Sequence, residues 1–100
     1  MNNVRFILTA KAQDDLDSIG EYTLERWGTE QVVSYLSRID ATFEKLCLSE
    51  ANDRDASEVK GGLLSVQAGS HVVFFNRRDN GDVVILRILL HQRMDFRRHL

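Results

Sequence analysis

The 100-residue sequence contains no proline and a single cysteine, Cys47. One cysteine cannot form an internal disulfide, so the composition is consistent with a reducing compartment. No apolar run approaches the roughly 18 residues that a membrane span requires, and the start of the chain lacks the long apolar segment of a signal peptide. The sequence also contains no low-complexity tract. We therefore expect a soluble, cytoplasmic protein.

Motifs of enzymes and cofactor sites are also scarce. Gly61, Gly62 and Gly69 have neither the spacing nor the placement of a phosphate-binding or dinucleotide-binding loop. The histidines and the cysteine do not have zinc-ligand spacing. Ser70 and His71 are adjacent, and adjacent residues of a strand point to opposite faces, so they cannot form a catalytic pair. The sequence thus predicts no catalytic residues, no metal and no cofactor.

Charge is low in total but unevenly distributed. The net charge is −2, with −4 in residues 1–50 and +2 in residues 51–100. A chain with a net negative charge is a poor candidate for general nucleic-acid coating, and we expect no sequence-specific DNA binding. The length and the 43% hydrophobic content indicate one domain, residues 1–100.

The last third of the chain predicts a β-hairpin. Two β-branched and aromatic runs, 71–77 and 83–90, flank Asp79-Asn80-Gly81-Asp82. Asn-Gly favours a two-residue type I′ turn, in which both central residues need positive φ. A third strand over 63–68 would complete an antiparallel meander. It follows a stretch over 50–58 that has no apolar period and is expected to be a long loop.

Two helices are predicted in the first half. Thr9 can cap a helix that begins at Ala10, and Gly28 can end it. Thr29 can then cap a second helix, from about Glu30 to Leu48. The apolar positions recur at helical spacing in each, and we expect them to face the core: Ala12, Leu16, Ile19 and Thr23 in the first helix, and Val32, Leu36, Ile39, Phe43 and Leu46 in the second.

The order of these elements defines the expected fold class. A strand over 4–8, expected to be buried on both faces, is followed by two helices, a loop and three strands. This order predicts an α+β domain with a helical hairpin packed on one face of a mostly antiparallel sheet.

Two groups of side chains are candidates for binding a partner. Leu24 lies away from the core stripe, and Tyr22 and Tyr35 lie at the stripe edges. These three residues either pack against the sheet, are isolated surface residues, or form the rim of a binding groove. Trp27 is either a core residue at the helix end or part of that rim. The second group is the basic C-terminal end, in which Arg87, Arg93, Arg97, Arg98 and two histidines accompany one acid, Asp95.

The basic end also permits one catalytic scheme. Metal-free RNA cleavage needs a base, an acid and cations beside the phosphate. His91 could act with Arg87, Arg93 and Arg97 in this way. The alternative is that this histidine is structural or a simple surface donor.

Four stretches of the sequence together resemble the ParE toxins of the RelE/ParE superfamily, over essentially the whole chain. They are the helix start Leu8-Thr9-Ala10-Lys11-Ala12-Gln13-Asp14-Asp15-Leu16, Tyr22-Thr23 with Arg26-Trp27-Gly28, Ser70-His71-Val72-Val73-Phe74-Phe75, and the ending from Arg87 to Asp95 with His99-Leu100. The chain departs from the pattern in two places. Relatives commonly carry a proline and a Gly-Arg pair in the long loop, and a glycine where Gln92 stands.

The resemblance implies the toxin of a type II toxin–antitoxin pair, which binds and poisons DNA gyrase and is not an enzyme. A ParD-like antitoxin would neutralise it in a hetero-oligomer. On this interpretation the gyrase-directed surface comprises Arg93, Met94, Asp95, Arg97, Arg98 and His99, and the antitoxin-binding residues are Tyr22, Leu24, Trp27, Tyr35 and Arg87. The alternatives are an internal ion pair for Asp95 and packing of the tail for Met94 and Phe96.

The alternative function is that of the ribonuclease branch of the superfamily. The resemblance implies that members of this branch are strongly basic proteins that cut mRNA on the ribosome. This chain has three lysines and a pI near 5.9. Because phosphate neutralisation dominates affinity for RNA, the sequence favours gyrase inhibition over ribosome-dependent cleavage.

Overall fold

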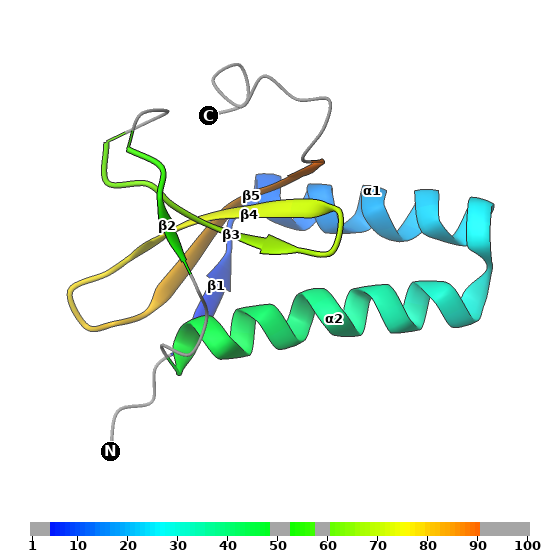
Figure 1. Cartoon of the computed structure of the whole chain (residues 1–100), viewed down its shortest axis with the longest axis horizontal. Helices are drawn as coiled ribbons and strands as arrows, with labels where there is room; N and C mark the ends of the chain where they lie inside the picture. Colours follow the sequence, from blue (N-terminus) through cyan, green and yellow to red (C-terminus); the bar gives the residue numbers. More distant parts are fainter. Residues whose placement is uncertain (1–4, 49–52, 58–60, 91–100) are drawn as a thin grey trace.

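The computed structural model describes residues 5–48, 53–57 and 61–90 (Figure 1). The elements follow in the order β1 (Phe6–Leu8), α1 (Ala10–Trp27), α2 (Thr29–Cys47), β2 (Arg54–Asp55), β3 (Leu64–Ala68), β4 (His71–Arg77) and β5 (Val83–Leu90). The prediction of an α+β fold with an N-terminal strand, a helical hairpin and an antiparallel meander is confirmed.

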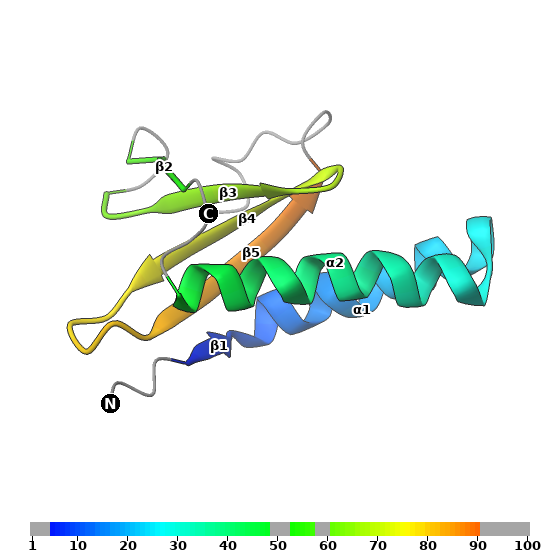
Figure 2. The same ribbon diagram turned by 60° about the horizontal axis from the view of Figure 1, so that its bottom comes forward.

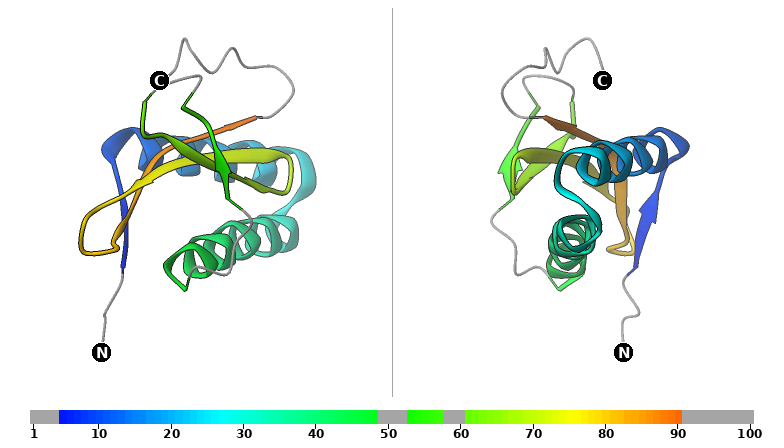
Figure 3. Two further views of the ribbon diagram at one scale, coloured as in Figure 1. Left: turned by 60° about the vertical axis from the view of Figure 1, so that its left-hand side comes forward. Right: turned by 90° about the vertical axis from the view of Figure 1, so that its right-hand side faces the viewer.

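One sheet holds the strands in the order β1-β5-β4-β3-β2. The right-hand view of Figure 3 shows β1 and β2 at opposite edges. β1 pairs with β5 in parallel, which requires a long crossover, and the two helices provide it. The expectation that β1 is buried on both faces is wrong. The strand lies at the edge and its three residues are only half-buried.

The long loop predicted over 50–58 contains a short strand. β2 pairs antiparallel with Ser65 and Leu64 of β3, and the backbone N–H of Ala56 donates to the Leu63 carbonyl at 2.9 Å. Two residues are too few to give a strand pattern in the sequence. This edge strand was therefore missed.

The hairpin between β4 and β5 is confirmed, but its turn is not the predicted type I′. The Gly81 N–H donates to the Arg78 carbonyl at 2.9 Å, and the Arg78 N–H donates to Asp82 at 2.8 Å. Asp79 and Asn80 therefore occupy the centre of the turn, and Gly81 follows with a positive φ of 92°. A turn followed by a left-handed residue is the common three-residue hairpin loop, in which glycine is favoured at the last position.

The ends of the helices follow the sequence with one exception. The Thr9 hydroxyl accepts a hydrogen bond from the Ala12 N–H at 3.1 Å, and Gly28 ends α1 with φ of 87°. The predicted cap at Thr29 is wrong. Thr29 is already the first helical residue of α2, and Gly28 precedes it without a side-chain hydrogen bond. The connection between the helices is thus a single residue, which forces them to run antiparallel.

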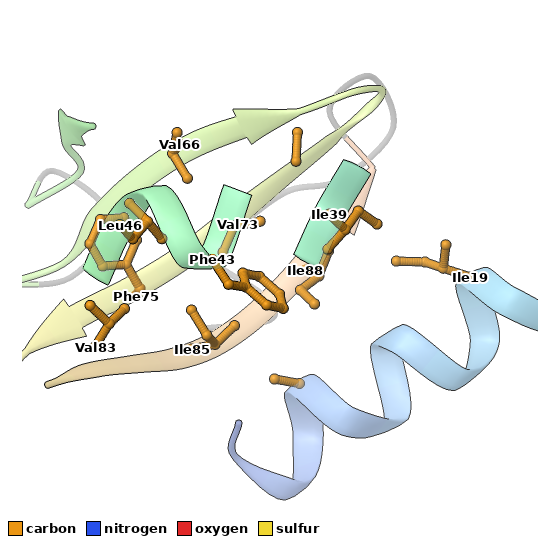
Figure 4. Packing of buried hydrophobic residues seen from close by; sticks show 12 residues of the cluster. Ile19, Ile39, Phe43, Leu46, Val66, Val73, Phe75, Val83, Ile85 and Ile88 are labelled. Atoms are coloured by element: carbon orange, nitrogen blue, oxygen red, sulfur yellow. The ribbon is translucent and has the colours of Figure 1, made fainter. Parts of the chain in front are cut away.

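The main core lies between the two helices and one face of the sheet (Figure 4). Ile39, Phe43 and Leu46 of α2 are buried there as predicted. Their partners on the sheet include Val73, Phe75, Val83, Ile85 and Ile88, and α1 contributes Ala12 and Ile19.

The other side of the sheet carries a second apolar cluster, which we call the far face. It consists of Ala56, Leu63, Val72, Phe74 and Leu89, with Leu86 packed beside them. Successive residues of a strand alternate between the two faces. In β4, Val73 and Phe75 therefore point toward the helices, and Val72 and Phe74 point to the far face. Both faces of this strand are therefore apolar.

Candidate partner-binding surfaces

A hollow of about 480 Å³ opens between the helices near the first turns of α1. Apolar side chains from β1, α1 and α2 line it, together with polar side chains from α2. The lining residues are Leu8, Leu16, Leu36, Ser37, Asp40, Ala41, Phe43 and Glu44. We call this the hairpin groove.

A second hollow, also of about 480 Å³, adjoins the hairpin groove through the shared residue Glu44. Arg5, Phe6, Cys47 and Leu48 complete its lining. Burial raises the pKa of the Cys47 thiol, and Arg77 only partly offsets this, so Cys47 is a neutral, apolar side chain at neutral pH. The two hollows together give α2 a long, largely apolar flank.

The same flank continues toward the tip of the hairpin. Leu16, Gly20 and Leu24 follow one another at intervals of four on α1, and Trp27 lies one turn further. Gly20 faces Leu36 of α2, so this side of α1 adjoins the hairpin groove. Leu24 is 51% exposed and Trp27 69% exposed. The tip extends beyond the sheet in Figures 1 and 2, which explains why nothing in the described sheet covers them.

Tyr22 lies elsewhere on α1. It precedes Leu24 by two residues, which at about 100° per residue places the two side chains on nearly opposite sides of the helix. The guanidinium of Arg26 stacks on the Tyr22 ring at 5.2 Å. The structure therefore brings Leu24 and Trp27 together but separates Tyr22 from them.

Tyr35 points inward to the turn between β3 and β4. Its hydroxyl accepts a hydrogen bond from the Ser70 N–H at 2.9 Å and lies 2.6 Å from Nδ1 of His71. The ring covers Gly69, where a Cβ would come within 2.6 Å of it. The φ of +60° at Gly69 also favours glycine. Tyr35 thus ties α2 to the sheet, and this contact explains its position at the edge of the apolar stripe.

Arg87 also has a structural role that its sequence context does not reveal. Its Nε and Nη2 donate to the two carboxylate oxygens of Asp15, each at 2.8 Å, and the Ile88 N–H donates to the same carboxylate at 2.9 Å. The hydrogen bonds to Asp15 raise the pKa of Arg87, which stays charged. The side chains of Arg87 and Asp15 are only 17% and 13% exposed. A partner could therefore contact only the small exposed part of these two side chains.

The predicted gyrase-directed residues and His91 lie outside the described residues. Of the RNA-cleavage scheme, only Arg87 is described, and it is engaged with Asp15. Burial lowers the pKa of His71, an effect that Asp15 partly offsets, so its imidazole is neutral at neutral pH beside Tyr35. Within residues 5–48, 53–57 and 61–90, no group of three or more His, Cys, Asp or Glu side chains is placed to hold a metal ion.

The hairpin groove was missed by sequence reasoning. Leu16 and Leu36 were expected in the core, yet both are only half-buried because they sit where the groove opens. Helical spacing does not distinguish a buried apolar residue from one that lines a groove. The only available signal was the small or polar character of their neighbours Ser37, Asp40 and Ala41.

Comparison with known proteins defines the class. The family described as the ParE toxin of the type II toxin–antitoxin system, parDE, matches residues 6–96. Toxin ParE1 of Caulobacter vibrioides is 37% identical over 93 residues, covering 93% of this chain and 94% of the relative. Toxin ParE1 of Mycobacterium tuberculosis is 32% identical over 96 residues, covering 96% and 97% of the two chains.

A solved structure shares the fold. The chromosomal ParDE toxin–antitoxin system from P. aeruginosa superposes with a TM-score of 0.72 at 19% identity, covering 90% of this chain and 98% of that one. The fold and the sequence matches together define the toxin component of a type II toxin–antitoxin pair. The chain belongs to the ParE toxin family. This membership agrees with the prediction of a binding protein rather than an enzyme.

Replacing Asp15 tests the contact with β5. We expect Asp15→Ala to lower the free energy of unfolding by about 3 kcal/mol, because it leaves the Arg87 charge and the Ile88 N–H without this partner in a poorly solvated site. Denaturant unfolding measures the loss. Asp14→Ala, one residue earlier and exposed, is the matched control and should change stability by less than about 0.5 kcal/mol. Equal losses in the two variants would contradict the role of Asp15.

A pair of glycine substitutions isolates the Tyr35 contact. Gly69 and Gly62 both have positive φ, but a Cβ at Gly62 would meet no atom within 4 Å. Gly62→Ala should therefore cost only the backbone strain, about 1 kcal/mol. Gly69→Ala should cost about 1–3 kcal/mol more because the methyl group meets the Tyr35 ring. Thermal or denaturant unfolding compares them, and indistinguishable costs would show that Tyr35 does not press on this turn.

Proposed function

We propose that this protein acts in the cytoplasm, inhibits DNA gyrase and is neutralised by a ParD-like antitoxin. The observation that carries the proposal is the ParE family match over residues 6–96, together with the gyrase inhibition that the resemblance to ParE toxins implies. No helix in the described residues is long and apolar enough to cross a membrane. Two surfaces are needed, one for the antitoxin and one for the target.

The hairpin groove supports binding of an amphipathic antitoxin helix. Leu16, Leu36 and Phe43 are among its apolar lining residues, which suits the helix-in-groove mode of recognition. From Val33 to Leu48 the flank of α2 spans about 22 Å at 1.5 Å per residue, enough for four turns of a partner helix. Asp40 and Glu44 on the rim favour a partner that places basic residues beside its apolar stripe.

Leu24 and Trp27 extend this surface to the tip of the hairpin. Exposed aromatic residues beside an apolar groove are typical binding anchors. Tyr22 would be reached only by a segment that crosses to the other side of α1. Tyr35 and Arg87 act from within the fold, and we propose that they support the surface by holding α2 and α1 on the sheet.

The gyrase-directed surface is proposed at the C-terminal end, with Arg93, Met94, Asp95, Arg97, Arg98 and His99. These residues follow β5, whose last described residue, Leu90, pairs with His71. Arginine suits such a surface because its planar guanidinium binds carboxylate or phosphate with two hydrogen bonds. The hairpin groove lies on the helices, whereas the proposed gyrase-directed residues follow β5 in the sequence, so the two proposed surfaces belong to different parts of the chain.

A purified gyrase supercoiling assay with ATP tests the function. The protein alone should accumulate cleaved linear DNA after denaturation, and added antitoxin should abolish it. Arg93→Ala with Arg97→Ala should reduce cleavage at least tenfold, which corresponds to about 1.4 kcal/mol of lost binding. Arg54→Ala with Arg78→Ala removes the same charge from exposed positions and should leave activity within about twofold.

Two results would contradict these proposals. Undiminished poisoning by the Arg93 and Arg97 double variant, at equal soluble expression, would remove the basic end as the target surface. No effect of the folded wild-type protein on gyrase would remove the proposed target, and ribosome-dependent cleavage of mRNA would then be assayed.

A bulky side chain in the hairpin groove tests the antitoxin surface. Ser37 is exposed and lines the groove, so Ser37→Arg should block a partner helix and weaken antitoxin binding at least tenfold, about 1.4 kcal/mol. Thr42→Arg is the control, because Thr42 is a half-buried hydroxyl residue of α2 that lies about 140° around the helix from Ser37. Calorimetric titration measures both affinities. Equal affinities for the two variants would place the antitoxin elsewhere.

A further inference from the structure

The Tyr35 hydroxyl of α2 lies among three polar groups at the turn between β3 and β4. The Ser70 N–H donates to it at 2.9 Å, Nδ1 of His71 lies 2.6 Å away, and the Ala68 carbonyl lies 3.4 Å away. A hydroxyl has one proton to donate. The distance of 2.6 Å is typical of a hydroxyl donor and is shorter than the roughly 2.7 Å at which N–H donors begin. Tyr35 therefore donates to Nδ1, and His71 carries its proton on Nε2.

The surroundings of His71 keep this acceptor neutral. Burial lowers the pKa of His71, and the charge of Asp15 on α1 only partly offsets this effect. Asp15 is itself bound by Arg87 of β5. The residues that pair with His71 on the neighbouring strands, Ala68 of β3 and Leu90 of β5, do not titrate, and from α2 the hydroxyl described above reaches the ring. Nδ1 is therefore available at neutral pH to accept a hydrogen bond.

This contact holds one half of α2 and not the other. Tyr35 lies in the second turn of the helix, next to Leu36, which lines the hairpin groove. The last turn has an independent hold, because Nη1 of Arg77 donates to the Leu46 carbonyl at 2.9 Å. A change at His71 should therefore affect the first turns of α2 and leave the last turn in place.

A proton on His71 would reverse the direction of the short hydrogen bond. An imidazolium has two N–H donors and no acceptor. Nδ1 would then donate to the Tyr35 oxygen, which already accepts the Ser70 N–H, and the hydroxyl proton would be left with the distant Ala68 carbonyl. Burial also makes the added charge unfavourable at this position. Protonation thus removes the acceptor that fixes Tyr35 against the turn.

We propose that His71 is a positioning residue for the first turns of α2. As the neutral Nε2–H tautomer it accepts the Tyr35 hydroxyl and holds the helix on the turn between β3 and β4, and protonation releases this hold. The consequence for binding rests on the proposed function: the antitoxin surface of α2 loses affinity when His71 is protonated.

The sign of the effect on stability follows from the direction of the shift. The pKa of His71 is lower in the folded chain than its ordinary value of 6.5, so the unfolded chain takes up the proton first. The free energy of unfolding therefore falls as the pH drops below about 6.5, and this loss levels off below the folded pKa.

Nitrogen NMR of the imidazole rings in the isotope-labelled full chain tests the tautomer and follows its protonation. His71→Asn identifies the signals of His71 by their loss. We expect an unprotonated Nδ1 in the neutral ring, and a mixture of tautomers in Tyr35→Phe because the donor is gone. A neutral ring protonated on Nδ1 would overturn the proposal. A ring that stays neutral until the chain unfolds in acid would overturn it as well.

Two substitutions separate the hydrogen bond from the ring. His71→Asn places an amide oxygen near the position of Nδ1 and cannot titrate, so it should keep the hold on Tyr35 at every pH. His71→Leu offers no acceptor and should lose the hold at every pH. Hydrogen exchange of the free toxin measures the hold, as protection corrected for the intrinsic effect of pH. In the wild type, protection of residues 32–36 should fall about threefold or more once NMR shows His71 protonated, while residues 43–47 keep theirs.

An equal fall in His71→Asn would overturn the proposal, and this variant decides the matter even if His71→Leu fails to fold. Both measurements use the toxin alone, so their outcome is separable from that of the proposed function. Calorimetric titration then tests the consequence. The wild type should lose antitoxin affinity several-fold on protonation relative to His71→Asn. Parallel pH profiles would contradict this consequence, whereas no binding at any pH would contradict the proposed function instead.

Discussion

The carboxylate of Asp15 fixes how the helical hairpin sits on the sheet. β1 pairs with β5 only as far as Ile85, and beyond that residue the outer edge of β5 would be open. Asp15 closes this edge by accepting the Ile88 N–H and binding both donor groups of Arg87. Thr9 adds a second link, because its hydroxyl donates to the Leu86 carbonyl while it caps α1. An open strand edge invites unwanted pairing, so these contacts protect the sheet as well as orient α1.

This orientation determines which surfaces remain available to partners. With Asp15 held at β5, α1 turns Ala12 and Ile19 into the core. Leu16, on the adjoining side of the helix, then lines the hairpin groove, and Leu24, about two turns further along the same side, stays exposed. Tyr35 fixes the second helix in a comparable way, through the turn at Gly69 and Ser70. The proposed antitoxin surface is therefore set by polar contacts on the sheet side of both helices.

The sequence predicts the elements well because their signals are local. Periodic apolar residues, Thr9 and Gly28 define the helices, and the runs around Gly81 define the hairpin. Contacts between distant residues leave no such signal. Arg87 and Asp15 are 72 positions apart, and Tyr35 and His71 are 36 apart, so both pairs were recognisable only in the folded chain.

The candidate site shows the same limit. Leu24 was placed outside the core stripe, and it is exposed. Trp27 was left open between a core residue at the helix end and part of a binding rim, and its exposure contradicts the core role. Leu16 and Leu36 could not be identified as groove residues, because their spacing is that of core residues. The type of turn at Asn80 also escaped prediction, since the dipeptide suits both a two-residue and a three-residue loop.

The most direct test of the account is hydrogen exchange, followed by mass spectrometry, on the full toxin alone and with its antitoxin. If the antitoxin occupies the hairpin groove, added protection should concentrate in residues 33–48 of α2 and extend to the tip at Leu24 and Trp27. Protection confined to the strands, with residues 33–48 exchanging as in the free toxin, would contradict the account.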